Sequence, residues 1–402
     1  MGLRAFSTLM LATFSASLGL AVITPFLPEL AQSHGANGFW IGMIFAGFGI
    51  SRGIVTPFIG KVSDRVGRKI FVVVGLIIYT AVSIFYTKAD SVYFLTLVRL
   101  IQGLSAGMIL PIVMTYIGEL SKRGKEGLTT GVMNTVVFLG VAIGPLAGGE
   151  LAERFGFNSV FYAMAALGAA TLLLTVFFLP EANPVQSRKA PGLNGAKGTV
   201  PKEKSRPKEP LNVFLRHNYV KSVLIMTFVS VALTAVFMSF LPSVAVSDEV
   251  DMMHIGFIVS FAIILAGILQ IPLGRFAEHQ TRLGQLLQTS LGVSISMMAI
   301  FVLPSCPDFK SLMLAGGFMG IGVGIATAAF SYIAIRIGKA IGMGTWMGIF
   351  WAVMSAGLVI APIGAGIIMD RMGIDPIFYS FGIFAFFTII LSIYLARHKE
   401  EA

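Results

Sequence analysis

The stretch GKVSDRVGRK (Gly60–Lys69) is a short, strongly charged segment that lies between two long apolar runs, at 40–60 and 70–88. Each run has about the 20 residues that an α-helix needs to cross the hydrocarbon core of a bilayer. This order of apolar and charged segments predicts two antiparallel membrane-spanning helices, joined by a tight turn at one membrane face.

The same pattern extends over the whole chain of 402 residues, of which 56% are hydrophobic and only 12% are charged. A soluble domain carries about 25% charged residues, so this chain has too few charges to solvate the outside of a soluble core. The sequence therefore predicts an all-α membrane protein of about twelve transmembrane helices. Apolar runs of spanning length lie at 6–28, 40–60, 70–88, 92–117, 128–152, 158–179, 219–243, 254–274, 283–303, 309–335, 343–368 and 374–396.

The basic residues predict the orientation of these helices. With the N-terminus placed inside, only Lys88, Arg154, Lys310 and Arg371 of the 29 Lys and Arg residues fall in outward-facing segments. This distribution follows the positive-inside rule, so both termini are expected to be cytoplasmic. It also accounts for the net charge of +10 without a nucleic-acid partner, because the charges do not gather on one face.

An internal duplication divides the chain into two similar halves. GPLAGGELAERFGFNSVFY (Gly144–Tyr162) aligns with APIGAGIIMDRMGIDPIFY (Ala361–Tyr379). The segment 181–217 between the halves is rich in Pro, Gly, Lys and Arg, which is typical of a flexible cytoplasmic linker. We therefore expect an N-terminal six-helix bundle at 1–180 and a C-terminal one at 218–402, with a central site between them near mid-membrane.

Asp64 is the residue of the charged stretch that most needs a partner. It lies near the C-terminal end of a helix, where the helix dipole disfavours a carboxylate. The start of the eleventh helix, at Gly342–Thr345, lies on the same side and would supply a positive helix end. Arg65 and Arg68 are the alternative partners. The first pairing predicts a latch between the two halves, whereas a solvated turn would only set the topology.

The stretch at Gly60–Lys69 resembles the signature loop of the major facilitator superfamily, and the twelve-helix drug/proton antiporters of that superfamily in particular. LGLAVITPFLPEL (Leu18–Leu30) is similar to the first-helix motif of the family, and RLIQGLSAG (Arg99–Gly107) to its fourth-helix motif. GVAIGPLAGG (Gly140–Gly149) resembles the fifth-helix motif of the antiporters. The resemblance implies two six-helix bundles that open alternately to either side of the membrane, and secondary active transport.

Three groups of residues take roles from this resemblance. Within the gating group, Glu119 is expected to pair with Arg68, since both would be cytoplasmic. The small residues of the fifth-helix group allow close helix contact, and the resemblance implies that this seam lies between the halves; plain helix packing is the alternative. The gating group is Gly60, Asp64, Arg65, Gly67, Arg68 and Glu119. The fifth-helix group is Gly140, Gly144, Pro145, Gly148 and Gly149, and the first-helix group is Pro25, Pro28 and Glu29.

Two arginines, Arg52 and Arg99, fall inside predicted spans. A charge at membrane depth is costly and usually faces a cavity or a partner, so both are candidates for substrate contact or coupling. Aromatic, Met and polar residues at helical spacing complete a predicted cavity wall, although such stripes also pack against lipid or neighbouring helices. The cavity candidates are Phe45, Phe48, Arg52, Arg99, Gln102, Asn134, Phe138, Thr234, Phe237, Trp346, Phe350 and Met354.

The chain departs from the drug exporters in its acidic residues. No Asp or Glu lies in the middle of any predicted span, and Ala16 stands where tetracycline-exporter-like relatives carry an acid. A cavity with two arginines and no carboxylate favours a neutral or anionic amphiphile over a cationic drug.

The expected function is proton-coupled efflux of small apolar or amphiphilic compounds by a monomer in the bacterial inner membrane. Transport or flipping of an anionic or lipid-like substrate is the first alternative, and a non-transporting receptor with a transporter fold is the second. The string Gly49–Gly53 fits a G-x-S-x-G nucleophile motif, but Ser51 lies in an apolar run, so no enzyme is expected. The sequence likewise indicates no cofactor and no metal site.

Overall fold

The computed structural model describes residues 3–23, 27–36, 38–120, 125–180, 217–244 and 252–397 of the chain. Within these ranges the structure is helical and contains no β-strand. The elements are α1 (Leu3–Val22), α2 (Leu27–Ser33), α3 (Gly38–Val66), α4 (Lys69–Tyr86), α5 (Val92–Leu120), α6 (Glu126–Phe155), α7 (Phe157–Phe178), α9 (Asn218–Val244), α10 (Met252–Glu278), α11 (Arg282–Val302), the short 3₁₀ helix η2 (Leu303–Ser305), α12 (Phe309–Ile341), α13 (Met343–Met372) and α14 (Asp375–Arg397).

Eleven helices in the described part of the chain are long and apolar enough to cross a membrane, and Phe6–Val22 forms a shorter apolar helix beside them. In lipid every backbone N–H and C=O group needs a partner within the protein, which a continuous helix provides. The prediction of about twelve spans in an all-α membrane protein is confirmed, and the protein is a multi-pass membrane protein.

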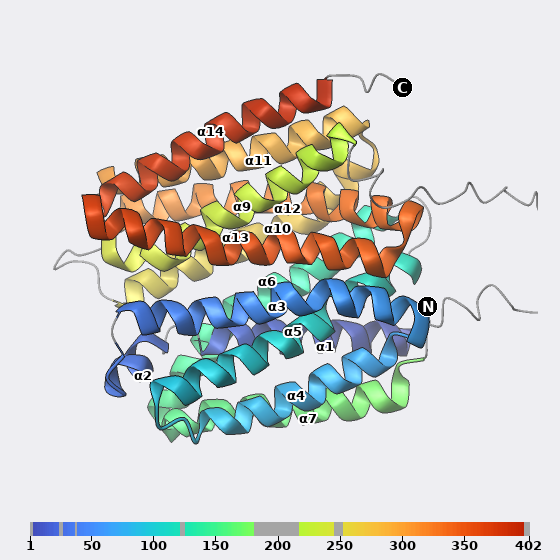
Figure 1. Cartoon of the computed structure of the whole chain (residues 1–402), viewed down its shortest axis with the longest axis vertical. Helices are drawn as coiled ribbons and strands as arrows, with labels where there is room; N and C mark the ends of the chain where they lie inside the picture. The colour runs from blue at the N-terminus through green and yellow to red at the C-terminus, as the bar shows by residue number, and fades with distance from the viewer. Residues whose placement is uncertain are drawn as a thin grey trace, which may run out of the picture.

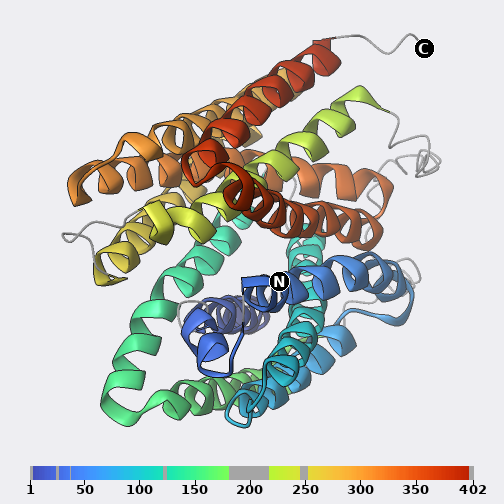
Figure 2. The ribbon, with the colours of Figure 1, turned by 60° about the vertical axis from the view of Figure 1, so that its left-hand side comes forward.

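The helices form two groups, α1–α7 and α9–α14, which lie one below the other in Figure 1 and are seen from a second side in Figure 2. The two groups pack by the same plan. In the first group α1 contacts α6 and α7, while α5 contacts α3 and α4; in the second, α9 contacts α13 and α14, while α12 contacts α10 and α11. This correspondence is what a duplicated six-helix unit requires.

The two groups meet mainly along two helix pairs, α3 with α13 and α6 with α10. The two contacts are equivalent by the internal duplication, because α3 corresponds to α10 and α13 corresponds to α6. The ends of these four helices that hold Asp64, Glu278, Glu126 and Met343 lie together, and we call this end of the molecule the latch end. It is the end that the basic residues predict to be cytoplasmic.

The structure corrects two sequence predictions about helix ends. The first apolar run, at 6–28, is not one helix: α1 ends at Val22, and α2 begins separately at Leu27. Residues 24–26, which the sequence places between them, lie outside the described part of the chain. The charged stretch Gly60–Lys69 is also mostly helix rather than turn, because α3 continues to Val66 and α4 begins at Lys69.

A single glycine makes the reversal between α3 and α4. Gly67 has a φ of +114°, a backbone conformation that only glycine adopts without strain, and Arg68 is the N-cap residue of α4. The tight turn therefore needs two residues, and Asp64 stays on a helix that fixes its direction.

The predicted linker at 181–217 lies outside the described residues except for His217. The described helices on either side are α7, which ends at Phe178, and α9, which begins at Asn218. The domain limits 1–180 and 218–402 remain predictions.

Candidate functional site

The carboxylate of Asp64, near the end of α3, lies against the first turn of α13. Its Oδ1 accepts a hydrogen bond from the backbone N–H of Gly344 (3.2 Å), and its Oδ2 accepts from the backbone N–H (3.2 Å) and the hydroxyl (3.3 Å) of Thr345. Nη2 of Arg68 also donates to Oδ1, at 3.1 Å. The predicted contact between Asp64 and the start of the eleventh helix is present, and we call it the first latch.

The start of α13 explains why a carboxylate from another helix binds there. Its N-cap residue is Gly342, which has a φ of +134° and no side chain to accept from the N–H groups of the first turn. Those N–H groups have no partner within their own helix, and the positive end of the helix dipole favours an anion. Asp64 therefore supplies, from the other half of the molecule, the cap that Gly342 lacks.

Glycines allow this contact by bringing the two backbones together. A Cβ atom on Gly60 would lie 2.2 Å from the carbonyl oxygen of Gly344, and one on Gly344 would lie 2.3 Å from the carbonyl oxygen of Gly60. One turn further along α13, a Cβ atom on Gly348 would lie 2.8 Å from Cα of Pro57. Any larger residue at these positions would push α3 and α13 apart.

A second latch joins α10 to α6 in the same way. Oε1 of Glu278 accepts a hydrogen bond from the backbone N–H of Leu128 (2.9 Å), in the first turn of α6. The N-cap residue of α6, Lys125, makes no side-chain cap of its own. A Cβ atom on Gly127 would lie 2.0 Å from the carbonyl oxygen of Gly274, and one on Gly274 would lie 2.4 Å from that of Gly127. The latch therefore occurs twice, once in each copy of the duplicated unit.

An ion pair that the sequence analysis missed also joins the two halves at the latch end. Nζ of Lys339, at the end of α12, lies 2.7 Å from Oε1 of Glu126, the first residue of α6. The Glu126 side chain is 11% exposed and that of Lys339 29% exposed, so the pair is partly shielded from solvent. Both residues lie at predicted helix ends, but the sequence contains no signal that pairs one with the other.

Met343, the first residue of α13, is a second feature that the sequence analysis missed. A Cβ atom on Gly118 of α5 would lie 1.9 Å from Cε of Met343, and one on Gly338 of α12 would lie 2.4 Å from its Sδ. Met343 is 4% exposed. Its thioether is therefore wedged between one helix of each half, at the latch end.

Reversing the charge of either member of the Glu126–Lys339 pair is expected to loosen the latch end. A cysteine at Ile335 reports this, because Ile335 is buried and its Cγ2 lies 3.5 Å from the position that a Cβ of Gly118 would take. In a Cys306→Ser background, Glu126→Lys and Lys339→Glu should each raise the rate of maleimide labelling at Ile335→Cys about fivefold or more, since like charges then meet at a shielded site.

The double charge exchange should return the labelling rate close to that of the parent, because the pair is restored in the opposite sense. Glu150→Lys is the matched control: Glu150 pairs with Arg154 on the same helix, both side chains are more than half exposed, and such pairs contribute little. Labelling of the double variant as fast as that of the single variants would contradict the role of this ion pair in closure.

The remaining gating residues are partly accounted for. Arg65 is exposed, whereas the Arg68 side chain is fully buried beside Asp64. The expected pairing of Arg68 with Glu119 falls on a side chain outside the described part of the structure, as do the side chains of the first-helix residues Pro28 and Glu29. Pro25 of the same motif also lies outside the described residues.

Gly140 and Gly144 of the fifth-helix motif pack within the N-terminal group and not between the halves, which corrects the expectation from the resemblance. A Cβ atom on Gly140 would meet Ser17, and one on Gly144 would meet Val22, so this face of α6 packs on α1 within the N-terminal group. Gly148 is buried, whereas Gly149 has no atom within 4 Å of its Cβ position. A small-residue face predicts close packing but does not name the partner helix.

Pro145 does not break the helix that carries this motif. The helix α6 runs without interruption from Glu126 to Phe155, with Pro145 inside it. The duplicated motif behaves in the same way, since α13 continues through Pro362, and a Cβ atom on Gly357 would lie 2.8 Å from the carbonyl oxygen of Phe228 on α9.

Arg99 is held inside the N-terminal group. Its Nη1 donates to Oε1 of Gln102 (2.8 Å), which also accepts from the hydroxyl of Tyr86 (2.7 Å). Nε2 of Gln102 donates to the carbonyl oxygen of Gly19 on α1 (3.1 Å). The Arg99 side chain is almost fully buried. Gln102, predicted as a cavity residue, therefore anchors this arginine to α4 and α1.

Arg52 lies instead where the two halves meet. Its Nε donates to Oγ of Ser355 on α13 (2.9 Å), and its guanidinium lies 5.3 Å from the ring centroid of Phe48 and 5.5 Å from that of Trp351. The guanidinium of Arg99 lies 5.7 Å from the same Phe48 ring and 5.7 Å from that of Phe45. Phe48 thus contacts both arginines, and with Phe45 and Gln102 the structure brings together five of the predicted cavity residues.

The other cavity candidates are also largely packed at helix contacts. Asn134 donates to Oε1 of Gln270 (3.0 Å) and to the hydroxyl of Ser331 (3.1 Å), which joins α6 to both α10 and α12. Phe138 lies where a Cβ of Gly267 would be 3.0 Å away. Phe237, Trp346 and Phe350 are buried, and Thr234 and Met354 are partly buried.

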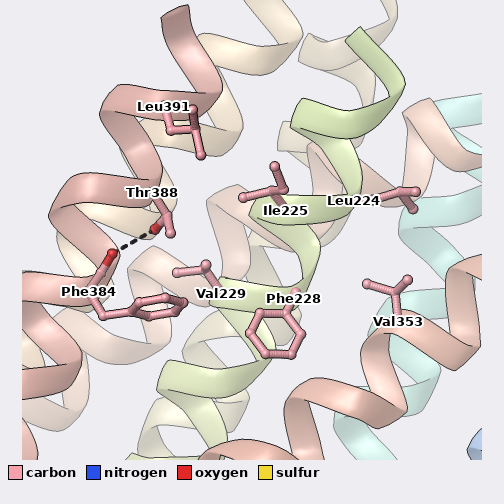
Figure 3. A pocket seen from close by; sticks show the side chains of 8 residues that line it. All are labelled: Leu224, Ile225, Phe228, Val229, Val353, Phe384, Thr388 and Leu391. Carbon is pink, nitrogen blue, oxygen red and sulfur yellow. Dashed lines mark hydrogen bonds between the residues drawn. The ribbon is translucent and has the colours of Figure 1, made fainter. Parts of the chain in front are cut away.

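A pocket of about 380 Å³ lies elsewhere, on the C-terminal group, where α9, α13 and α14 meet (Figure 3). Its lining is apolar except for Thr388, whose hydroxyl already donates to the carbonyl oxygen of Phe384 (3.0 Å). None of the cavity residues predicted from the sequence lines this pocket. We therefore take the contact region around Arg52 and the two latches as the candidate functional site.

Comparisons with known proteins agree with this architecture. Over 387 residues, or 95% of both chains, the protein is 25% identical to an uncharacterized MFS-type transporter of Methanocaldococcus jannaschii. Over 164 residues, which are 41% of this chain and 42% of the relative, it is 29% identical to the quinolone resistance protein NorA of Staphylococcus aureus.

Among solved structures, that of the human organic anion transporter MFSD10 (TETRAN) superposes with a TM-score of 0.77 at 17% sequence identity, over 97% of this chain and 99% of that one. At this identity the likeness concerns the fold. The sequence model of the Major Facilitator Superfamily matches residues 9–338 and 223–402, which together cover nearly the whole chain. The chain belongs to the Major Facilitator Superfamily and is a membrane transporter.

Proposed function

We propose that this transporter exports small apolar or amphiphilic compounds from the cell, as a monomer of the cell membrane with both termini cytoplasmic. The observation that carries the proposal is the double latch, which closes the two halves at the end that the basic residues assign to the cytoplasm. The similarity to the quinolone resistance protein NorA supports export, since that relative is named for drug resistance.

The latches suit a transporter that opens alternately to each side. Each one holds a helix of one half to the start of a helix in the other half by a few directed hydrogen bonds. Separation of Asp64 from α13 and of Glu278 from α6 would let the two halves rock apart at the latch end. The helix contacts within each half would stay intact, so the motion is close to a rigid-body one.

The character of the contact region supports an apolar or amphiphilic substrate. Phe48 of α3 and Trp351 of α13 flank Arg52 where the two halves meet. When the halves separate, these rings would face the opening. Aromatic surfaces bind flat apolar bodies well and tolerate changes in ligand shape.

We assign the driving force to the proton gradient, with the coupling protons carried by the latch carboxylates. No Asp or Glu lies in the middle of an apolar run, whereas Asp64, Glu126 and Glu278 all bridge the two halves at the latch end. Protonation would remove the negative charge that a helix N-terminus or Lys339 attracts, which would weaken closure. Arg68 also forms an ion pair with Asp64, at the same end of the molecule.

The test is efflux from energised cells that express the protein. Cells are preloaded with phenylnaphthylamine, a neutral aromatic dye, or with ethidium, a cation, and the loss of fluorescence is followed with and without a protonophore. We expect protonophore-sensitive efflux of the neutral dye above that of vector-only cells. Efflux no faster than that of the vector control, from cells shown to contain the protein in the membrane, would refute the proposal.

A further inference from the structure

The two buried arginines have no acidic partner within the described structure. Arg52 is 5% exposed and Arg99 is 2% exposed, and the ion pairs among the described residues involve other side chains. The sequence offers no Asp or Glu in the middle of any apolar run. An uncompensated cation at membrane depth is costly, and an anion that binds during the transport cycle would offset that cost.

Of the two, Arg52 is the one placed to receive a ligand. Arg99 is tied through Gln102 to Tyr86 and Gly19, inside a single half. Arg52 lies midway along α3, against α13 of the other half, and its guanidinium makes a single hydrogen bond, from Nε to Ser355. Its terminal nitrogens donate to none of the described residues. Transporters with parallel repeats bind their substrates at such a position, between the halves and near mid-membrane.

The neighbours of Arg52 supply a second hydrogen-bond donor without an acceptor and two aromatic rings. The indole N–H of Trp351 is buried and has no hydrogen-bond partner among the described residues, and the Trp351 side chain is 8% exposed. The rings of Trp351 and Phe48 lie 5.5 Å and 5.3 Å from the guanidinium. The cluster therefore offers donors without a matching acceptor, beside aromatic faces. An anion supplies the acceptor, and an aromatic body fits the faces.

We propose that Arg52 and the indole N–H of Trp351 bind the anionic group of the substrate, a carboxylate or sulfonate attached to an aromatic body. This inference rests on the proposed export function and adds a substrate class to it: aromatic organic anions, alongside neutral amphiphiles. The Nε bond from Arg52 to Ser355 joins α3 to α13, so an anion that draws the guanidinium towards itself competes with a contact between the halves. Substrate binding is thereby linked to the separation of α3 from α13.

The experiment compares two probes that share one aromatic body and differ by a sulfonate: anilinonaphthalene sulfonate and the neutral phenylnaphthylamine. Binding is measured to the full-length protein in phosphatidylcholine nanodiscs, with empty nanodiscs subtracted, so that no anionic lipid competes. Arg52→Gln should weaken binding of the sulfonate at least about tenfold, the loss expected for a charge-assisted hydrogen bond, while the neutral probe binds within about twofold of wild type.

Two further variants separate charge from fold. Arg52→Lys keeps the positive charge and should recover part of the sulfonate affinity. Arg282→Gln removes a different arginine, which lies over the ring of Tyr219, and should change the binding of neither probe. An inorganic phosphate competitor distinguishes a simple anion site from one that needs the aromatic body: phosphate at equal concentration should displace little of the sulfonate.

The outcomes distinguish the site from the function on which it rests. Equal binding of the sulfonate to wild type and Arg52→Gln, or no sulfonate binding to wild type, would overturn the site. If wild type binds the sulfonate through Arg52 but neither probe leaves preloaded proteoliposomes faster than protein-free vesicles, the site stands and the export function fails.

Discussion

Replacing Gly60 by alanine should lower the transport rate about tenfold by disfavouring closure of the latch end. The new methyl group would lie 2.2 Å from the carbonyl oxygen of Gly344, and a backbone atom cannot turn aside as a flexible side chain can. Overpacking of this kind costs about 1–3 kcal/mol. Because the clash exists only when the latch end is closed, it shifts the equilibrium between closed and open states about five- to hundredfold towards the open state. Efflux of phenylnaphthylamine and maleimide labelling of Ile335→Cys measure the two consequences.

The chain offers matched controls for this substitution. Gly344→Ala tests the same contact from the other side and should behave like Gly60→Ala, while Gly127→Ala should do the same at the second latch. Gly149→Ala adds the same methyl group to a motif glycine that has no atom within 4 Å of its Cβ position, and it should leave transport unchanged. If Gly60→Ala closed and transported like Gly149→Ala, direct backbone contact would not be part of closure.

The second large effect is expected for Asp64→Asn. The substitution keeps the size of the side chain but removes the charge that the start of α13 and Arg68 bind. A hydrogen bond to a charged group is worth about 1.5–3 kcal/mol, and a charge at a helix N-terminus about 0.3–1 kcal/mol. Closure should therefore weaken about tenfold or more, with faster labelling of Ile335→Cys and slower transport.

Substitutions at two neighbouring residues serve as comparisons for Asp64→Asn. Thr345→Val removes only the hydroxyl donor at 3.3 Å and leaves both backbone N–H groups, so its effect should be several-fold smaller than that of Asp64→Asn. Arg65→Gln removes an exposed charge one residue away and should have little effect. Labelling of Asp64→Asn at the parent rate would show that the carboxylate does not hold the latch end closed.

The first latch was predictable from local physics. A carboxylate at the C-terminal end of a helix needs an unusual partner, and only a few helix starts lie at the same membrane face. The second latch, between Glu278 and the start of α6, was not predicted, although it repeats the first one in the other copy of the duplicated unit. The number of spans followed from run length alone, since the bilayer fixes how many apolar residues a helix needs.

Contacts that depend on the register between the two halves could not be predicted from the sequence. The pairing of Glu126 with Lys339, and of Arg52 with Ser355, is set by how far one bundle slides along the other, which no local pattern encodes. The glycine face at Gly140 was assigned to the wrong partner for the same reason. Small residues indicate that a helix comes close, and many helices are available to do so.

The wedge formed by Met343 has a consequence for leakage. Where α5, α12 and α13 meet, a thioether fills the space between Gly118 and Gly338, and the paired glycines of the two latches place backbone against backbone on either side. An apolar constriction of this kind opposes the passage of water and hydrated ions. Closure of the latch end is therefore expected to block ion leakage as well as substrate passage. The cell would then keep its ion gradients while the transporter is in this closed state.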